Sequence, residues 1–251
     1  MSITGKGSED SGSHWISISD MMTGLMVIFM FIAIAFMIDV LNEKKEQNII
    51  FEEFKQVQEN LFDELEKEFE EEFQNWDMEL DRDLSIRFTN VDVLFDEGDY
   101  TIQKQFGKIL DEFLPRYFEV LRQEKYRENI MEIRIEGHSD NTPINPKRGY
   151  DKHPYIGNVQ LSQERARSVM KHFMVSPYFT RLDRDEKRQL EYWLTANGLS
   201  YGRMLNLKGK LQKEHGGQAD PNQSRRVEFR IVTASEKVVQ QVLDRIRESQ
   251  K

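Results

Sequence analysis

The sequence predicts a single N-terminal transmembrane helix, a helical connector and a C-terminal α/β or α+β domain. Three observations carry this prediction. Residues 21–38 form one apolar run, segment 42–83 repeats its apolar residues with a helical period, and from residue 84 onward strand-like and helix-like patterns alternate. The expected parts are therefore a tail, a span, a connector and a folded domain, at 1–14, 15–41, 42–83 and 84–251.

The composition excludes several classes of function. The 251-residue chain has a formal net charge of -9, and because nucleic-acid binding requires clustered Lys and Arg, we expect no nucleic-acid partner. Cysteine is absent, which excludes disulfides, thiol catalysis and zinc–thiolate sites. The five histidines show no H-x-x-x-H spacing, and the sequence contains no nucleophile triad or phosphate loop. We therefore expect no enzyme, no cofactor and no metal.

Residues 15–41 are expected to form one transmembrane helix. Apart from Thr23, residues 21–38 are all Met, Leu, Val, Ile, Phe, Ala or Gly, and as a helix they cover about 27 Å, close to the hydrocarbon core. Trp15 stands where an interfacial aromatic residue is expected. A cleaved signal peptide is the alternative, but this sequence lacks the basic N-terminal region and the small-residue cleavage site that a signal peptide requires. The Gly- and Ser-rich tail, 1–14, is expected to be disordered.

The connector, 42–83, is rich in Glu, Lys and Gln and contains no Pro or Gly. Its apolar residues recur about every 3.75 positions, which is a helical period nearer to an 11-residue repeat than to a heptad. They are Ile50, Phe54, Val57, Leu61, Leu65, Phe69, Phe73, Trp76 and Leu80. We interpret the segment as a helix that pairs with its copy in a dimer. The alternative is one amphipathic helix that lies on the globular domain.

From residue 84 the pattern indicates a domain that mixes strands and helices. Alternating apolar and polar residues predict strands at 85–89, 91–95, 131–135 and 227–231. Helical stripes predict helices at about 102–121, 162–174, 183–195 and 235–248. Pro115 is expected to kink or split the first of these helices. A polar loop is expected over 140–157.

Five motifs of this domain resemble those of OmpA-like domains and occur in the family order. They are V-L-F-D-E-G at 93–98, I-E-G-H-S-D-N-T-P at 135–143, N-V-Q-L-S-Q-E-R-A at 158–166, G-L-S-Y-G at 198–202 and S-R-R-V-E at 224–228. One departure is Ser224, where the family usually has Asn. The resemblance implies a mixed sheet packed by helices, and a domain that binds the stem peptide of peptidoglycan.

The resemblance also implies which residues bind peptidoglycan. In the family, the Asp of G-H-T-D pairs with the ligand ammonium, chiefly that of diaminopimelate, and the Arg of L-S-x-x-R-A pairs with its carboxylate. These positions are Asp140 and Arg165. A zwitterionic amino-acid end does require one anion and one fork-shaped cation at a fixed separation. Asn158 and Arg226 are expected to add polar contacts. Taken singly, Asp140 also fits a turn and Arg165 a solvated helical position.

The span carries a second resemblance. Residues 15–26, W-I-S-I-S-D-M-M-T-G-L-M, resemble the W-x-x-x-x-D-x-M-T-x-x-M pattern of MotB stator proteins. The resemblance implies that Asp20 carries protons between a dimer of this chain and a pentameric, multi-span MotA-like partner, with Thr23 lining the channel. A carboxylate suits this task because burial shifts its pKa and lets it cycle between charged and neutral forms. By position alone, Asp20 also fits a helix N-cap before the apolar run.

Together the resemblances imply a proton-driven stator B subunit in the bacterial inner membrane. Its N-terminus would be cytoplasmic and its C-terminal domain periplasmic, although Lys6 before the span and Lys44 and Lys45 after it do not favour this orientation. The short, nearly neutral tail and the acidic helix resemble the B subunits of Zorya anti-phage systems more than those of flagellar motors. A flagellar stator B subunit is one alternative. A passive cell-wall tether, in which Asp20 is only a cap, is the other.

Overall fold

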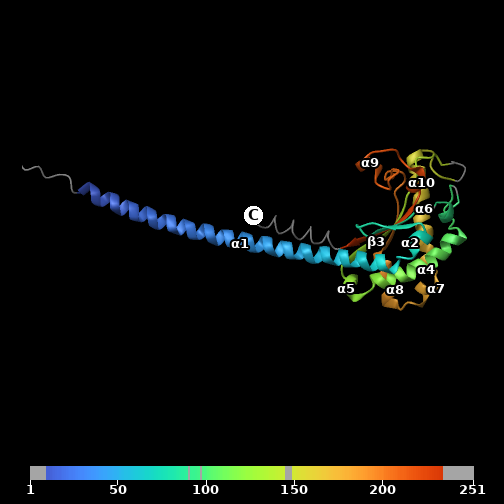
Figure 1. The fold of residues 1–251 in the computed structure, drawn as a ribbon, viewed down its shortest axis with the longest axis horizontal. Coiled ribbons are helices and arrows are strands. Elements are labelled where there is room, and N and C mark those ends of the chain that lie inside the picture. The colour runs from blue at the N-terminus through green and yellow to red at the C-terminus, as the bar shows by residue number, and fades with distance from the viewer. Residues whose placement is uncertain (1–9, 90, 97, 145–148, 234–251) are drawn as a thin grey trace, which may run out of the picture. The chain divides into compact units, whose positions relative to one another are not determined.

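The computed structural model describes residues 10–89, 91–96, 98–144 and 149–233. By its internal contacts the chain divides into two compact units, Met1–Glu53 and Phe54–Lys251. Helix α1 (Asp10–Glu68) makes up the described part of the first unit and continues into the second (Figure 1).

The first unit contains the predicted membrane span. Residues Ser19–Lys45 of α1 are long and apolar enough to cross a membrane, and an 18-residue window within them has a mean hydropathy of 2.7. Their large apolar side chains are exposed, from 41% at Val27 to 77% at Met21. A helix that is this apolar on all sides is expected to be covered by lipid or by partner helices.

Helix α1 begins earlier than the sequence predicts. Residues 1–9 lie outside the described part, but residues 10–14, which were expected to be disordered, are already helical. Once a helix is nucleated by a strong segment, each added residue contributes one hydrogen bond, and Ser and Asp lower helix stability only modestly. The span therefore extends its helix back into a polar tail.

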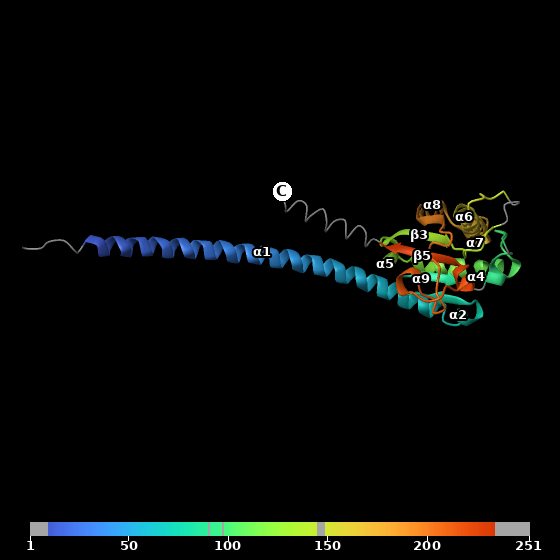
Figure 2. The same ribbon diagram turned by 90° about the horizontal axis from the view of Figure 1, so that it is seen from above.

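The second unit is a five-stranded mixed sheet packed by helices, as predicted. Its strand order is β1-β2-β5-β3-β4. Strands β3 and β4 are parallel, and the other neighbouring pairs are antiparallel; Figure 2 shows β3 and β5 side by side. The strands are β1 (Met78–Leu80), β2 (Ser85–Phe88), β3 (Ile130–Gly137), β4 (Leu194–Gly198) and β5 (Val227–Thr233).

Helices precede, connect and cover these strands (Figure 1). In the described part of this unit, the two longest that lie wholly within it are α4 (Lys104–Leu121) and α6 (Pro154–Met174). The shorter ones are α2 (Glu72–Asn75), α3 (Val91–Leu94), α5 (Glu124–Arg127), α7 (Pro177–Arg181), α8 (Arg184–Trp193), α9 (Gln212–His215) and α10 (Pro221–Ser224).

One face of the sheet forms the hydrophobic core. Alternate residues of β2, β3 and β5 point into it and are at most 1% exposed: Ile86, Phe88, Ile133, Ile135 and Phe229. The ring of Phe113, on α4, lies 5.1 Å from that of Phe88 and 5.2 Å from that of Phe229, both edge to face. Aromatic packing of this kind adds to the free energy gained by burying apolar surface.

The intervening residues of the same strands make the other face of the sheet charged. Arg87 of β2, Glu136 of β3 and Glu228 of β5 are nevertheless buried, because the segment 203–215, which contains α9, lies over them. The Arg87 guanidinium donates to the carbonyl oxygen of Gly209 at 3.0 Å. The sheet thus has an apolar face and an ionic face, and the ionic face is buried at Arg87, Glu136 and Glu228.

The end of α1 belongs to the core of the second unit. Leu61, Leu65 and Phe69, which follows α1, are at most 1% exposed, and the ring of Phe69 lies 5.1 Å from that of Phe113. Arg116 of α4 also pairs with Glu68 at 2.6 Å. These apolar residues therefore pack within one chain, which is the alternative that the sequence left open.

The predicted domain boundary at residue 84 is accordingly too late, since the second unit begins at Phe54. Four further members of the predicted connector seam pack against the same core: Val57, Phe73, Trp76 and Leu80. A repeat of apolar residues does not reveal what it packs against, because a core and a partner helix demand the same period. The side chains of Ile50 and Phe54 lie outside the described residues, and pairing with a second copy stays a prediction.

Replacing Leu65 with alanine should destabilise the domain by about 2–5 kcal/mol, the usual cost of emptying a buried leucine site. For a chain of this size the melting temperature should fall by roughly 5–15 °C, which differential scanning fluorimetry of the detergent-solubilised protein would measure. Phe51→Ala, on the same helix but with Phe51 60% exposed, is the matched control and should change little. Equal shifts for the two variants would place Leu65 outside the core.

Several predicted elements need correction. Residues Val91–Leu94 form the single turn α3 rather than a strand, because a short alternating run does not distinguish the two. Pro115 lies inside α4 and does not split it. Helix α6 begins at Pro154, which shortens the expected loop 140–157. The predicted helix 183–195 ends at Trp193, and β4 begins at the next residue without a loop between them. The predicted helix 235–248 lies outside the described residues.

Candidate functional site

A cavity of about 290 Å³ opens where the end of β3, the start of α6 and the end of α10 meet. The residues that line it are Gly98, Ser139, Asp140, Thr142, Pro143, Ile144, Asn158, Leu161, Arg165 and Arg225. It brings together three of the four predicted peptidoglycan-binding residues, which come from two separate motifs.

Two glycines allow the strands to approach α6 closely enough to form this cavity. A Cβ atom at Gly137, the last residue of β3, would lie 2.0 Å from the carbonyl oxygen of Ser162. A Cβ atom at Gly198, the last residue of β4, would lie 2.5 Å from the backbone nitrogen of Gln163. Any side chain at these positions would push α6 away from the sheet. The glycines of the G-H-S-D and G-L-S-Y-G motifs therefore set the distance between Asp140 and the residues of α6.

Asp140 is the anionic group of the cavity, and it is only 3% exposed. Its Oδ2 accepts a hydrogen bond from Arg225 Nη1 at 2.9 Å, and its Oδ1 accepts one from the Thr142 backbone at 2.9 Å. The second bond closes an Asx turn, which fixes the carboxylate relative to the chain. Asp140 is thus both the turn residue of the simple interpretation and a charged group in a cavity wall.

Arg165 is the cationic group on α6, and it is 5% exposed. Its Nε donates to the carbonyl oxygen of Asp99 at 2.9 Å, and its guanidinium carbon lies 5.2 Å from the centre of the Phe95 ring. Burial lowers the pKa of Arg165 to about 10, so the side chain is still charged at neutral pH. A solvated helical arginine would be exposed, and the structure excludes that interpretation.

Asn158 lines the cavity but acts first on its shape. Its Nδ2 donates to the carbonyl oxygens of Thr142 at 3.1 Å and Pro154 at 3.0 Å. The side chain therefore ties the loop after Asp140 to the first turn of α6. We assign it a positioning role beside its place in the cavity wall.

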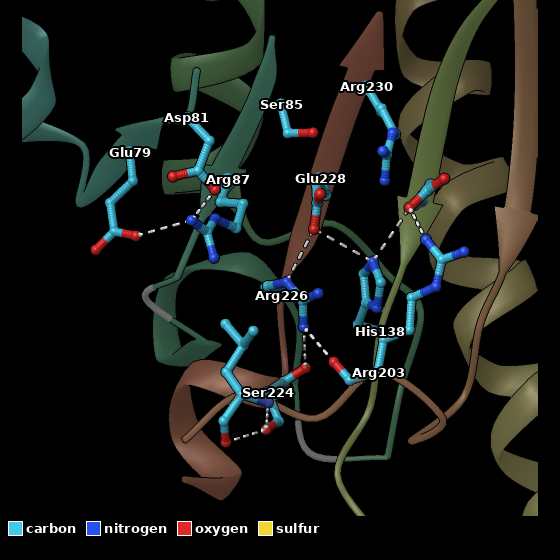
Figure 3. Close-up of polar contacts among 12 residues, drawn as sticks. Glu79, Asp81, Ser85, Arg87, His138, Arg203, Ser224, Arg226, Glu228 and Arg230 are labelled. Carbon is cyan, nitrogen blue, oxygen red and sulfur yellow. Dashed lines mark hydrogen bonds and ion pairs between the residues drawn. The ribbon is translucent and has the colours of Figure 1, made fainter. Parts of the chain in front are cut away.

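Arg226 does not reach the cavity, contrary to prediction. It lies on the charged face of the sheet, where its Nε donates to Glu228 Oε2 at 3.0 Å and its Nη1 donates to the carbonyl oxygens of Arg203 and Ser224 (Figure 3). Its neighbour Arg225 lines the cavity instead. Strand alternation distinguishes the two arginines: Val227 and Phe229 point into the core, so position 226 must face the other side of the sheet.

In the first unit, Asp20 and Thr23 lie on one face of α1, together with Gly24, because they are three and four residues apart. Asp20 is exposed and lies well inside a helix that begins at Asp10. It is therefore not the N-cap that its position in the sequence allowed. The Thr23 hydroxyl donates to the Ser19 carbonyl oxygen at 2.8 Å, and its oxygen keeps the capacity to accept a hydrogen bond.

Known proteins similar to this chain were found among curated sequences and among solved structures. No protein-family profile matches the chain. Among solved structures, the cell wall anchor of the T6SS from Pseudomonas aeruginosa is 20% identical with a TM-score of 0.43, covering 67% of this chain and 96% of that one. The periplasmic domain of Helicobacter pylori MotB is 17% identical with a TM-score of 0.40, covering 64% of this chain and 84% of that one.

The curated relative is similar over nearly the whole length. The Zorya protein ZorB of Escherichia coli strain Crooks is 35% identical over 239 residues, which is 94% of this chain and 94% of the relative. The matched region covers 94% of each chain, so the similarity extends beyond a single shared domain. The chain belongs to the ZorB family of Zorya proteins.

Proposed function

We propose that this protein is a stator-like B subunit that anchors to peptidoglycan through its C-terminal domain and carries protons at Asp20, in a Zorya-type defence against phage. The observation that carries the proposal is the cavity lined by both Asp140 and Arg165, which are both buried. A buried anion and a buried cation at fixed positions suit a ligand with an ammonium and a carboxylate.

The peptidoglycan stem peptide supplies such a ligand in the zwitterionic end of diaminopimelate. Its ammonium would approach Asp140 and its carboxylate would approach Arg165. Arg225 already pairs with Asp140 at 2.9 Å, its side chain is 32% exposed, and its Nη2 also donates to Asn222 Oδ1 at 2.7 Å. The ligand ammonium would then replace Arg225 at the carboxylate, which exchanges one charge-assisted hydrogen bond for another.

Asp20 supports the proton-carrying part of the proposal. A carboxylate within an apolar span is costly unless it faces a partner or a water path, and here no capping role accounts for it. The small residues Thr23 and Gly24 on the same face would let a partner helix approach closely. The partner in this proposal is a pentameric, multi-span MotA-like protein that surrounds two copies of this chain.

This arrangement requires the N-terminus in the cytoplasm and the domain in the periplasm, with α1 in the bacterial inner membrane. The domain then holds the wall while proton flow past Asp20 moves the partner ring. The proposal assigns the chain no chemical turnover and no cofactor of its own, since both tasks are binding and proton carriage.

The test is phage plating on cells that carry the gene with its native neighbours, compared with the same operon lacking only this gene. The complete operon should reduce plaque formation, and the deletion should remove that effect. Equal protection with and without the gene would contradict a defence role. Restored swimming in a flagellated strain without stators would favour the flagellar alternative, and purification without any multi-span partner would favour the passive tether.

A further inference from the structure

A second ionic cluster lies on the charged face of the sheet, apart from the peptidoglycan cavity. Glu136 of β3 and Glu228 of β5 are direct neighbours across the two antiparallel strands, and their residues are only 2% and 7% exposed. Two carboxylates opposite each other repel, and the repulsion is stronger when they are buried. A pair of this kind calls for a cation between the two groups.

His138 stands beside this pair, 1% exposed. Its Nε2 lies 3.5 Å from Glu136 Oε2 and 3.5 Å from Glu228 Oε2, and the three potential ligand atoms lie within 4.8 Å of one another. Within the described residues, neither ring nitrogen of His138 has a hydrogen-bond partner, and Glu136 Oε2 has none either. A buried imidazole and a buried carboxylate oxygen without partners are rare, because each costs the free energy of its lost hydration.

We propose that Glu136, His138 and Glu228 bind one divalent transition-metal ion, with Zn²⁺ the best match. Zinc bonds to imidazole nitrogen and carboxylate oxygen are about 2.0–2.1 Å long, so neighbouring ligands of a tetrahedral zinc are about 3.4 Å apart. The two 3.5 Å separations at His138 Nε2 agree with that distance between neighbouring ligands, whereas a hydrogen bond would be shorter.

Two arginines already contact the carboxylate oxygens of this cluster. Arg226 donates its Nε to Glu228 Oε2 at 3.0 Å, as outer hydrogen-bond donors do for carboxylates that bind metals, since each oxygen has a second lone pair. Arg203 is 3.7 Å from Glu136 Oε2 and its side chain is 47% exposed, so it holds that oxygen weakly. A cavity of about 280 Å³ on this face of the sheet is lined by Arg203, Arg226 and Glu228 among other residues.

The ion would brace the segments that carry the peptidoglycan cavity. Asp140 follows His138 by two residues, and Arg225 precedes Glu228 by three. An ion bound to His138 and Glu228 would therefore link the end of β3 to the start of β5, next to the Asp140–Arg225 pair. The two segments already share a backbone hydrogen bond from His138 to the Arg226 carbonyl oxygen at 3.0 Å. The site is therefore structural, and its existence does not depend on phage defence or on peptidoglycan binding.

The test uses the full chain in detergent, purified without a polyhistidine tag, stripped with a chelator and titrated with ZnCl₂ or CoCl₂. Elemental mass spectrometry after desalting should find one zinc per chain in the wild type. Glu136→Gln and His138→Gln should weaken binding at least about tenfold. His172→Gln is the matched control, because His172 pairs with Asp111 at 2.8 Å outside the cluster, and it should bind like the wild type.

Thermal stability supplies a second measurement that does not depend on how much metal survives purification. In chelator, Glu136→Gln should melt at or above the wild type, because it removes the repulsion with Glu228. In excess Zn²⁺ the order should reverse, because only the wild type gains the binding free energy, worth about 5 °C or more at saturation. The same order in both conditions, or equal metal binding by wild type and both glutamine variants, would overturn the proposal and leave a metal-free ionic network.

Discussion

Replacing Asp20 with asparagine is expected to reduce phage protection to the level of cells that lack the gene, while the protein still accumulates in the membrane. Asparagine has nearly the same size and keeps hydrogen-bonding groups, but it neither takes up nor releases a proton at any physiological pH. Helix stability should be unaffected, since α1 begins at Asp10 and Asp20 is not its cap. The efficiency of plating of a sensitive phage measures the effect, and immunoblotting of membranes measures the amount of protein.

The matched control is Asp39→Asn, the same substitution at the other end of the Ser19–Lys45 span. It should retain protection, because Asp39 is about 28 Å along the helix from Asp20 and lies on a different face. Asp20→Glu keeps the titratable group and should retain part of the activity. Full protection by Asp20→Asn would mean that Asp20 carries no protons, and the passive tether would then explain the chain better.

Replacing Arg165 with alanine is expected to weaken binding to peptidoglycan by at least about 30-fold. Removing one partner of a buried charge pair across an interface costs about 2–5 kcal/mol, because the ligand carboxylate would be left in the cavity without its cation. Sedimentation of the detergent-solubilised protein with purified sacculi measures the loss, and calorimetry with a soluble muropeptide that contains diaminopimelate gives the dissociation constant.

Arg167→Ala is the matched control for this variant. Arg167 lies two residues further along α6 with a side chain that is 71% exposed, and its removal should change binding little. Arg165→Lys keeps the charge but loses the planar fork, so it should bind at an intermediate level. Melting curves separate lost binding from lost folding, since Arg165 also contacts Asp99 and Phe95. Unchanged binding by a folded Arg165→Ala would exclude the cavity as the peptidoglycan site.

Features that depend on neighbouring residues could be predicted from the sequence alone. The span follows from one uninterrupted apolar run, whose length must match a bilayer whatever the rest of the chain does. Asp140, Asn158 and Arg165 lie in two contiguous motifs, which the resemblance to OmpA-like domains identifies from the sequence. The structure places all three in the lining of one cavity, and their binding of peptidoglycan stays a prediction.

The tertiary structure decided the features that depend on packing between distant segments. Leu61 and Leu65 have the same helical spacing whether they meet a second copy or their own domain, and only the fold shows that they are in the core. Arg225 and Arg226 are adjacent in the sequence, but the register of β5 against β3 turns one toward the cavity and the other toward Glu228. Glu136 and Glu228 are 92 positions apart in the chain, and no spacing rule joins them to His138. The sequence therefore determined the span and the two motifs, which are contiguous in the chain. The fold alone decided the core partner of α1, which of the two arginines lines the cavity, and the buried cluster, because side-chain proximity across strands is set by register and burial.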